Sequence, residues 1–330
     1  MFRTLKTGMA VAVATALEGL QQPVCLLLAF TAVELTILVP LVQLFSFGEG
    51  GRLARDSGLA ILLVGGMLLA AFTSGSTLAR EIASGTVAAA VSKPVPRWVF
   101  LLGKFAGAGI VVLLFCWIET IAILLAERCS EHYLETETTI GHVRDTTCGL
   151  LAMAAPALAL AKAAFVNWRF RWRFGLWFFI FLASIQTLLI AGIGLLGRNG
   201  AWLGFGGYAP AMDFRIVSAA ALVTMLLGIF CALATALSTR LQTGAAVAAS
   251  FAILFVGFLA DRHFGGGVGT LPRLLYAVLP DVQHFWVVDS LAGGGTIPKR
   301  YLLQAGGYAL SYMAFALALG AVSFQRRDLG

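Results

Sequence analysis

The sequence predicts an all-α, polytopic membrane helix bundle with about eight transmembrane helices, and three observations carry this prediction. Hydrophobic residues make up 59% of the chain and charged residues 12%, whereas soluble domains carry about 25% charged residues. Mean hydropathy is +0.89. Apolar runs long enough to cross a hydrocarbon core of about 30 Å follow one another along the chain. Because these runs use up its length, we expect residues 1–330 to form a single transmembrane domain.

The chain begins with a short segment, residues 1–19, that places Arg3 and Lys6 before a stretch of small apolar residues. We expect it to form an amphipathic helix lying at the inner membrane surface. A basic start, a short apolar core and small residues near its end are also typical of a signal peptide, which is the alternative.

The apolar runs that follow predict eight spans, separated by polar turns and two longer outer loops, 127–147 and 261–300. Orientation follows from the basic clusters Arg169–Arg171–Arg173 and Arg326–Arg327, which lie close to span ends. Because such clusters remain in the cytoplasm, we expect both termini there. The predicted spans are 23–47, 58–78, 98–126, 148–166, 174–196, 216–237, 244–259 and 301–324.

A polar segment, residues 80–97, separates the second and third spans. Arg80, Glu81, Lys93, Arg97 and, shortly after, Lys104 are too many charges for the centre of a bilayer. We therefore expect the chain to leave the membrane near residue 80 and to return near residue 98. Residues 82–92 can form a short helix, which the proline at 94 ends by removing a backbone donor.

The residues of this segment carry a family resemblance. Glu81-x-x-x-Gly85-Thr86, then Lys93-Pro94-x-x-Arg97-Trp98 and Gly103-Lys104, resembles the first cytoplasmic loop of ABC-2-type transporter permeases. Residues 279–285 and 324–329 resemble that family's last outer loop and C-terminus. The resemblance implies a coupling helix that docks on an ATP-binding subunit. It assigns the coupling role to Glu81, Gly85, Thr86, Lys93, Pro94, Arg97 and Lys104, against the alternative of an ordinary basic loop.

The middle of the chain departs from the family pattern. Such permeases commonly have six spans, and in this chain residues 148–196 are predicted to form two additional spans. We prefer a membrane hairpin because each half is long and apolar enough to span. The alternative is that residues 127–173 form something other than a full hairpin.

The resemblance implies a permease subunit of an ATP-driven ABC transporter, an exporter, in the inner (plasma) membrane of a bacterium. Its partners are then a separate ABC ATP-binding subunit, a second permease subunit (the same chain or a different one) and membrane lipids. The chain has no Gly-x-x-x-x-Gly-Lys-Ser/Thr loop, so we expect it to bind no cofactor and ATP with Mg²⁺ to bind the partner. The alternative is a membrane scaffold or assembly factor that does not transport.

The sequence gives little indication of an enzyme, a nucleic-acid-binding protein or a metal site. Common hydrolase and metalloprotease motifs do not occur, so we do not expect an enzyme. The basic residues are scattered at span ends, which argues against nucleic-acid binding. His132, Glu135, Glu137 and His142 share an outer loop but match no standard metal spacing, so a solvated acidic loop is expected there and no metal site.

Two carboxyls inside predicted spans, Glu34 and Glu119, are candidates for a polar path, because intramembrane charges are costly and commonly functional. The alternative is that neighbouring helices satisfy them. Trp168 and Trp172, among the arginines at 169–173, predict an aromatic-basic anchor that contacts anionic lipid. A second contact with the ATPase is the alternative for that turn.

Two of the five cysteines flank an outer loop. Cys129 follows the third span and Cys148 begins the fourth, 19 residues later. If the loop faces an oxidising periplasm, a disulfide between them is chemically allowed. It would restrict the unfolded chain by about 3 kcal/mol. The alternative is two free thiols, like the three cysteines within spans.

Overall fold

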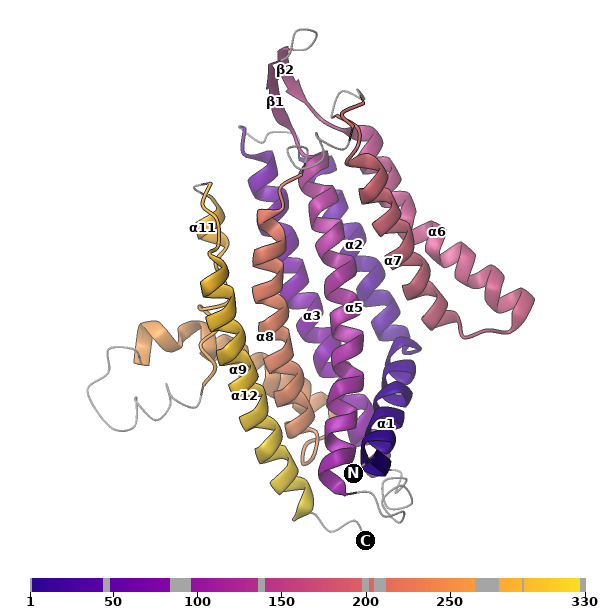
Figure 1. Cartoon of the computed structure of the whole chain (residues 1–330), viewed down its shortest axis with the longest axis vertical. Helices are drawn as coiled ribbons and strands as arrows, with labels where there is room; N and C mark the ends of the chain where they lie inside the picture. The colour runs from indigo at the N-terminus through magenta and orange to yellow at the C-terminus, as the bar shows by residue number, and fades with distance from the viewer. Residues whose placement is uncertain are drawn as a thin grey trace.

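The computed structural model describes residues 2–43, 48–83, 96–135, 140–197, 202–204, 212–264, 279–292 and 294–326. Among them, seven helices are long and apolar enough to cross a membrane, which gives the chain the character of a multi-pass membrane protein. These are α2, α3, α5, α6, α7, α8 and α12, and they stand side by side in one bundle (Figure 1). The prediction of a helical membrane bundle is confirmed to that extent.

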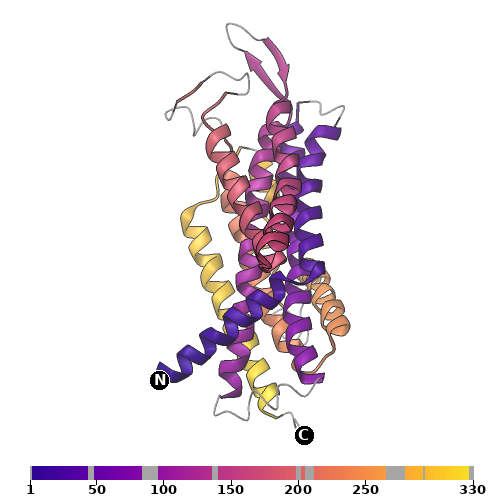
Figure 2. The same ribbon diagram turned by 90° about the vertical axis from the view of Figure 1, so that its right-hand side faces the viewer.

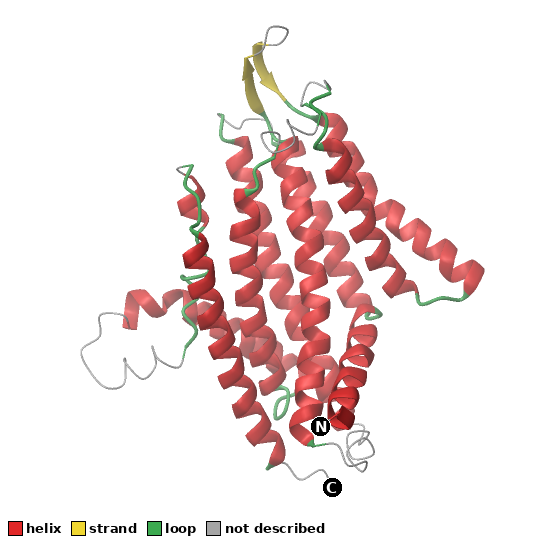
Figure 3. Cartoon of the chain, in the orientation of Figure 1, coloured by secondary structure: helices red, strands yellow, loops and turns green. Residues whose placement is uncertain are grey.

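Helices dominate the described chain (Figure 3). A two-stranded antiparallel hairpin is the exception, and it pairs His132 with Val143. In order, the elements are α1 (Phe2–Leu20), α2 (Pro23–Val42), α3 (Gly50–Ala83), α5 (Arg97–Cys129), β1 (His132–Glu135), β2 (Ile140–Val143), α6 (Thr146–Phe170), α7 (Phe174–Ile193), α8 (Arg215–Leu237), α9 (Thr243–Phe264), α11 (Val288–Ala292) and α12 (Lys299–Gln325).

Local signals explain several helix boundaries. Pro23 occupies the first turn of α2, where its missing N–H costs nothing. Asp145 caps α6, because its carboxylate accepts a hydrogen bond from the backbone N–H of Cys148 at 2.9 Å. At the other end of α6, Arg171 adopts a left-handed conformation (φ 56°), which reverses the chain into α7.

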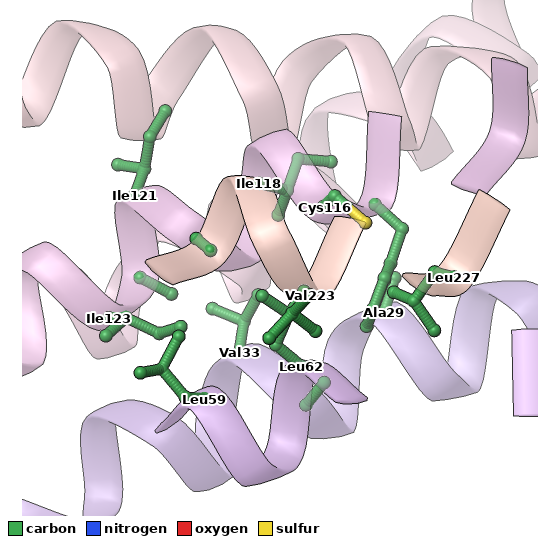
Figure 4. Close-up of a cluster of buried hydrophobic side chains, with 14 of the residues drawn as sticks. Ala29, Val33, Leu59, Leu62, Cys116, Ile118, Ile121, Ile123, Val223 and Leu227 are labelled. Carbon is green, nitrogen blue, oxygen red and sulfur yellow. The ribbon is translucent and has the colours of Figure 1, made fainter. Parts of the chain in front are cut away.

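The bundle core lies between α2, α3, α5 and α8. Figure 4 shows side chains from these helices, among them Val33, Leu62, Ile118 and Val223, packed against one another. A Cβ added at Gly66 would lie 2.3 Å from a methyl carbon of Leu227, so α3 and α8 approach closely at this glycine. The core therefore holds the central helices at fixed separations.

The two ends of the bundle differ. We call the end where α1 and α5 begin and α3 and α12 end the terminal end, and the end bearing β1 and β2 the hairpin end (Figures 1 and 2). The α6–α7 pair leans away from the bundle toward its turn (Figure 1). Helix α1 packs along α5, where Gly107 lies against the backbone carbonyl of Ala12.

The predicted spans fall on helices, but with differences. Helix α3 begins at Gly50 rather than near residue 58, because Arg52 pairs with Glu49 and Asp56 in its first turns. The predicted seventh span, 244–259, lies in α9, which is not among the seven and runs obliquely to them in Figure 1. The count of eight therefore stays a prediction, as do the locations of the termini and of α1 relative to a membrane.

Candidate functional site

The predicted coupling segment joins α3 to α5 at the terminal end. Glu81 lies in the last turn of α3, which continues to Ala83. Gly85, Thr86, Lys93 and Pro94 lie outside the described residues, as does most of the short helix expected over 82–92. Arg97, at the start of α5, and Lys104 are the two coupling candidates whose side-chain contacts the structure describes.

Arg97 contacts the C-terminal end of α12. Its Nη1 donates hydrogen bonds to the backbone carbonyls of Phe324 at 3.2 Å and Gln325 at 3.0 Å. Its guanidinium carbon lies 6.0 Å from the centre of the Phe324 ring. The last carbonyls of a helix lack hydrogen-bond donors within it and carry partial negative charge. A cationic donor there supplies the missing hydrogen bonds and balances that charge.

Arg240 contacts the same end of α12 from the turn between α8 and α9. Its Nε donates to Ser323 Oγ at 3.0 Å and its Nη2 to the Ser323 carbonyl at 3.1 Å. Arg97 and Arg240 thus hold residues 323–325 between them, and we call this arrangement the arginine clamp. It ties the start of α5, the end of α8 and the end of α12 together.

Lys104 lies about two turns after Arg97 on α5 and is buried, with 5% of its surface exposed. Its Nζ lies 5.5 Å from the centre of the Phe100 ring, which stacks on Phe324 at 6.4 Å between centroids. Its ammonium therefore packs within the bundle beside the arginine clamp. The Trp98 ring, by contrast, is about half exposed at 48%.

The two intramembrane carboxyls occupy different environments. Glu119 of α5 is fully buried and its Oε1 accepts a hydrogen bond from Thr36 Oγ1 of α2 at 2.5 Å. Its other oxygen, Oε2, is buried without a hydrogen-bond partner in the described part of the chain. Such a buried oxygen carries a desolvation penalty unless the carboxyl is protonated.

Glu34 does not join Glu119. It lies two residues before Thr36 on α2, about 200° around the helix, and is partly exposed. Within the described ranges, no hydrogen bond or ion pair involves its side chain. The structure therefore does not bring the two predicted path residues together, and their role remains a prediction.

A groove of about 650 Å³ runs between α5, α7 and α8. Cys116 lines it one turn before Glu119, and Trp117 and Thr187 lie at 3.4 Å across it, from the indole Nε1 to the hydroxyl. Glu119 is absent from its lining, because that side chain faces α2. The residues that line the groove are mostly apolar.

The aromatic-basic turn between α6 and α7 is well exposed, with Trp168 at 73%. The Trp172 ring stacks on Trp177, with 4.9 Å between centroids, and the Arg169 guanidinium carbon lies 5.3 Å from the centre of the Phe170 ring. Exposed aromatic rings with arginine side chains beside them are suited to the boundary between lipid and water.

The hairpin end holds a cluster of charges. Arg128, at the end of α5, is fully buried; its Nε lies 3.2 Å from Asp145 Oδ2, and its Nη2 donates to the Leu196 carbonyl at 2.6 Å. His132 Nε2 lies 3.0 Å from Glu127 Oε1. Among the described residues, no group of three or more His, Cys, Asp or Glu side chains is arranged to hold a metal ion.

A second pair at this end joins Arg215, the first residue of α8, to Asp213, two residues before it. Arg215 donates to the Asp213 carboxylate through Nε at 2.7 Å and through Nη2 at 2.9 Å. Partial burial acts to raise the pKa of Asp213, but the hydrogen bonds from the Arg215 side chain and backbone outweigh it and lower that pKa below 3.8.

The five cysteines are buried free thiols, and two of them meet. Cys129 is the last residue of α5 and Cys148 the third residue of α6, and Asp145 contacts both Arg128, the neighbour of Cys129, and the backbone N–H of Cys148. The structure thus brings the predicted pair close together. Nothing in the sequence identified the contacts of Arg128, Thr36 and Arg240, because the partners of these residues lie 17 to 83 positions away in the chain.

Comparison with known proteins provides no relative from which a role can be transferred. The chain matches no protein-family model and no curated protein sequence. The roles of the coupling segment, of the arginine clamp and of Glu119 are accordingly those that their own residues support.

Proposed function

We propose that this protein is the membrane-spanning permease subunit of an ATP-driven transporter of the ABC-2 type, whose ATP hydrolysis takes place in a separate subunit. The observation that carries the proposal is the pattern Glu81-x-x-x-Gly85-Thr86 with Lys93-Pro94-x-x-Arg97. It lies between the two longest helices, α3 and α5, at the end of the bundle where the first helix begins and the last one ends.

The helices on either side of the segment are suited to transmit movement. Helices α3 and α5 have 34 and 33 residues, which corresponds to about 50 Å each. Close glycine contacts join α3 to α8 and α1 to α5, so displacement of one helix end moves its neighbours. In the proposed mechanism, the ATP-binding subunit pushes on residues 82–92, and α3 and α5 carry the push into the bundle.

The arginine clamp extends this route to α12. Because Arg97 follows the segment directly and holds the carbonyls of Phe324 and Gln325, movement at the start of α5 is passed to the last helix. In this proposal, Arg97 and Lys104 act inside the permease, and Glu81 with the following residues contacts the ATPase.

The proposal also assigns the chain a membrane, an orientation and partner subunits. We place the chain in a bacterial inner membrane with the terminal end in the cytoplasm, paired with a second permease subunit and working as an exporter. ATP and Mg²⁺ would be held by the ATP-binding subunit. The exposed Trp168 and the neighbouring arginines would lie at the cytoplasmic lipid surface.

The test is ATP hydrolysis in the assembled complex. The full chain, tagged and purified in mild detergent from the cell that produces it, is reconstituted in lipid vesicles and its Mg²⁺-dependent ATPase activity is measured. We expect a co-purifying ATP-binding subunit whose hydrolysis increases when the transported compound is added. A stable complex that hydrolyses ATP at one rate under a broad panel of compounds would instead indicate the scaffold.

A further inference from the structure

The contact between Cys129 and Cys148 lies outside the proposed transport machinery. Cys129 ends α5 and Cys148 lies in the first turn of α6, and their exposed fractions are 0% and 1%. Both belong to the buried core cluster of the bundle. A disulfide between them requires that their Cα atoms lie within about 7 Å of each other.

The β-hairpin explains why the two cysteines meet. Its ladder pairs His132 with Val143. Three residues before His132 the chain is at Cys129, and three residues after Val143 it is at Thr146, two before Cys148. The hairpin therefore returns the chain to the level at which it left α5.

Polar contacts fix the same two helix ends. Arg128, next to Cys129, pairs with Asp145 at 3.2 Å. The other oxygen of Asp145 accepts the backbone N–H of Cys148 at 2.9 Å. One carboxylate thus links the residue before one cysteine to the backbone of the other, which holds the two thiols in place.

We propose that Cys129 and Cys148 form a disulfide that fastens the end of α5 to the start of α6. Bond formation is thiol–disulfide exchange with a protein disulfide of an oxidising compartment. One cysteine thiolate attacks that disulfide and releases one thiol, and the second cysteine then attacks the mixed disulfide and releases the other. The chain loses two electrons and two protons, and the oxidant becomes a dithiol.

Burial determines when this reaction takes place. In the packed bundle neither thiol is accessible, so the exchange precedes the docking of α6 on α5 during insertion. Once the helices have packed, the same burial protects the bond from reductants. The disulfide therefore requires the hairpin end to face the oxidising side, a requirement that holds for a transporter and for a scaffold alike.

The experiment is thiol trapping of the full chain in the cells that produce it. Cells are quenched in acid, the protein is unfolded in denaturant with N-ethylmaleimide and no reductant, and its peptides are analysed by mass spectrometry. We expect a peptide pair linked through Cys129 and Cys148, and alkylation of Cys25, Cys116 and Cys231, which are equally buried internal controls. Alkylation of all five cysteines overturns the proposal.

A variant separates this bond from chance oxidation during handling. In the Cys148→Ser protein we expect Cys129 to be fully alkylated, like the three controls. Cys25→Ser, the matched substitution of another buried thiol, should leave the linked peptide unchanged. Cys129 found linked to any other cysteine in the unaltered protein would contradict the assignment even if the serine variants fail to fold.

Discussion

A fully buried guanidinium costs several kcal/mol in desolvation unless close partners compensate it. Arg128 meets this cost with the Asp145 carboxylate and the Leu196 carbonyl, and so joins the end of α5 to the start of α6 and the chain beyond α7. Its Nη1 has no hydrogen-bond partner among the described residues. Such a group stabilises one arrangement of the helix ends and penalises others.

Removing one partner of this pair should therefore destabilise the bundle strongly. We expect Asp145→Asn to lower the free energy of unfolding by about 3 kcal/mol, because it leaves the Arg128 charge buried without its counterion. Arg52→Gln, which removes the surface pairs with Glu49 and Asp56, should cost at most about 1 kcal/mol. Denaturant unfolding in detergent compares the two, and equal effects would contradict the assigned role of Arg128.

Asp213 gives a prediction for pH. Because its pKa is lower in the folded protein than its ordinary 3.8, its pairing with Arg215 stabilises the fold above that pH. This contribution is lost as the pH falls through the lowered pKa. We expect Asp213→Asn to reduce stability at neutral pH and to make the fall in melting temperature below about pH 4 less steep. Parallel acid profiles of the two proteins would contradict this.

At the scale of the elements, two glycines of α5 form a matched pair. A Cβ at Gly107 would lie 2.5 Å from the Ala12 carbonyl oxygen, whereas one at Gly109 would have nothing within 4 Å. We expect Gly107→Ala to cost about 1–3 kcal/mol by pushing α1 from α5. Gly109→Ala should stabilise by up to about 1 kcal/mol through its higher helix propensity. Melting temperatures that move in the same direction would contradict the observed packing of α1.

The arginine clamp predicts a local effect at the end of α12. In Arg97→Met the carbonyls of residues 324 and 325 lose a charged donor, so the last turn of α12 should fray. We expect hydrogen exchange there to rise by about tenfold, corresponding to about 1.5 kcal/mol. Arg300→Met, at the exposed start of the same helix, is the control. Unchanged exchange in Arg97→Met would show that the clamp does not hold the helix end.

Much of the element order could be predicted from sequence, because long apolar runs determine membrane helices almost by length alone. Predicted span 98–126 lies within Arg97–Cys129, and 216–237 within Arg215–Leu237. The early start of α3 was missed, because its first turns are charged and look like a loop. The oblique direction of α9 and the strands β1 and β2 depend on packing and pairing that periodicity does not report.

The site was less predictable than the fold. The sequence identified Glu119, Cys129 and Cys148 as unusual from their position alone. The structure gives Glu119 a partner and brings the two cysteines close together. The coupling role of Arg97 and Lys104 stays a prediction. The sequence did not reveal their contacts with α12 and within α5, because no local pattern reports those partners.

At the scale of the whole molecule, the two ends of the bundle have different tasks in the proposed mechanism. The hairpin end is fixed by Arg128, Asp145 and the cysteine pair, which keep α5 and α6 together. The terminal end carries the segment between α3 and α5 and the arginine clamp. A push applied there would tilt the long helices about the fixed end, and this is how the fold would convert ATP-driven movement into transport.

The most direct test of this account is Glu81→Lys in the reconstituted complex, compared with Glu49→Lys, which makes the same charge change near the hairpin end. We predict that the Glu81→Lys chain inserts and binds lipid normally but loses compound-stimulated ATP hydrolysis by about tenfold or more, as expected when one charged contact of about 1.5–3 kcal/mol is lost. The Glu49→Lys complex should retain full stimulation. Normal co-purification and undiminished stimulation in Glu81→Lys would contradict the central claim that this segment couples the bundle to an ATPase.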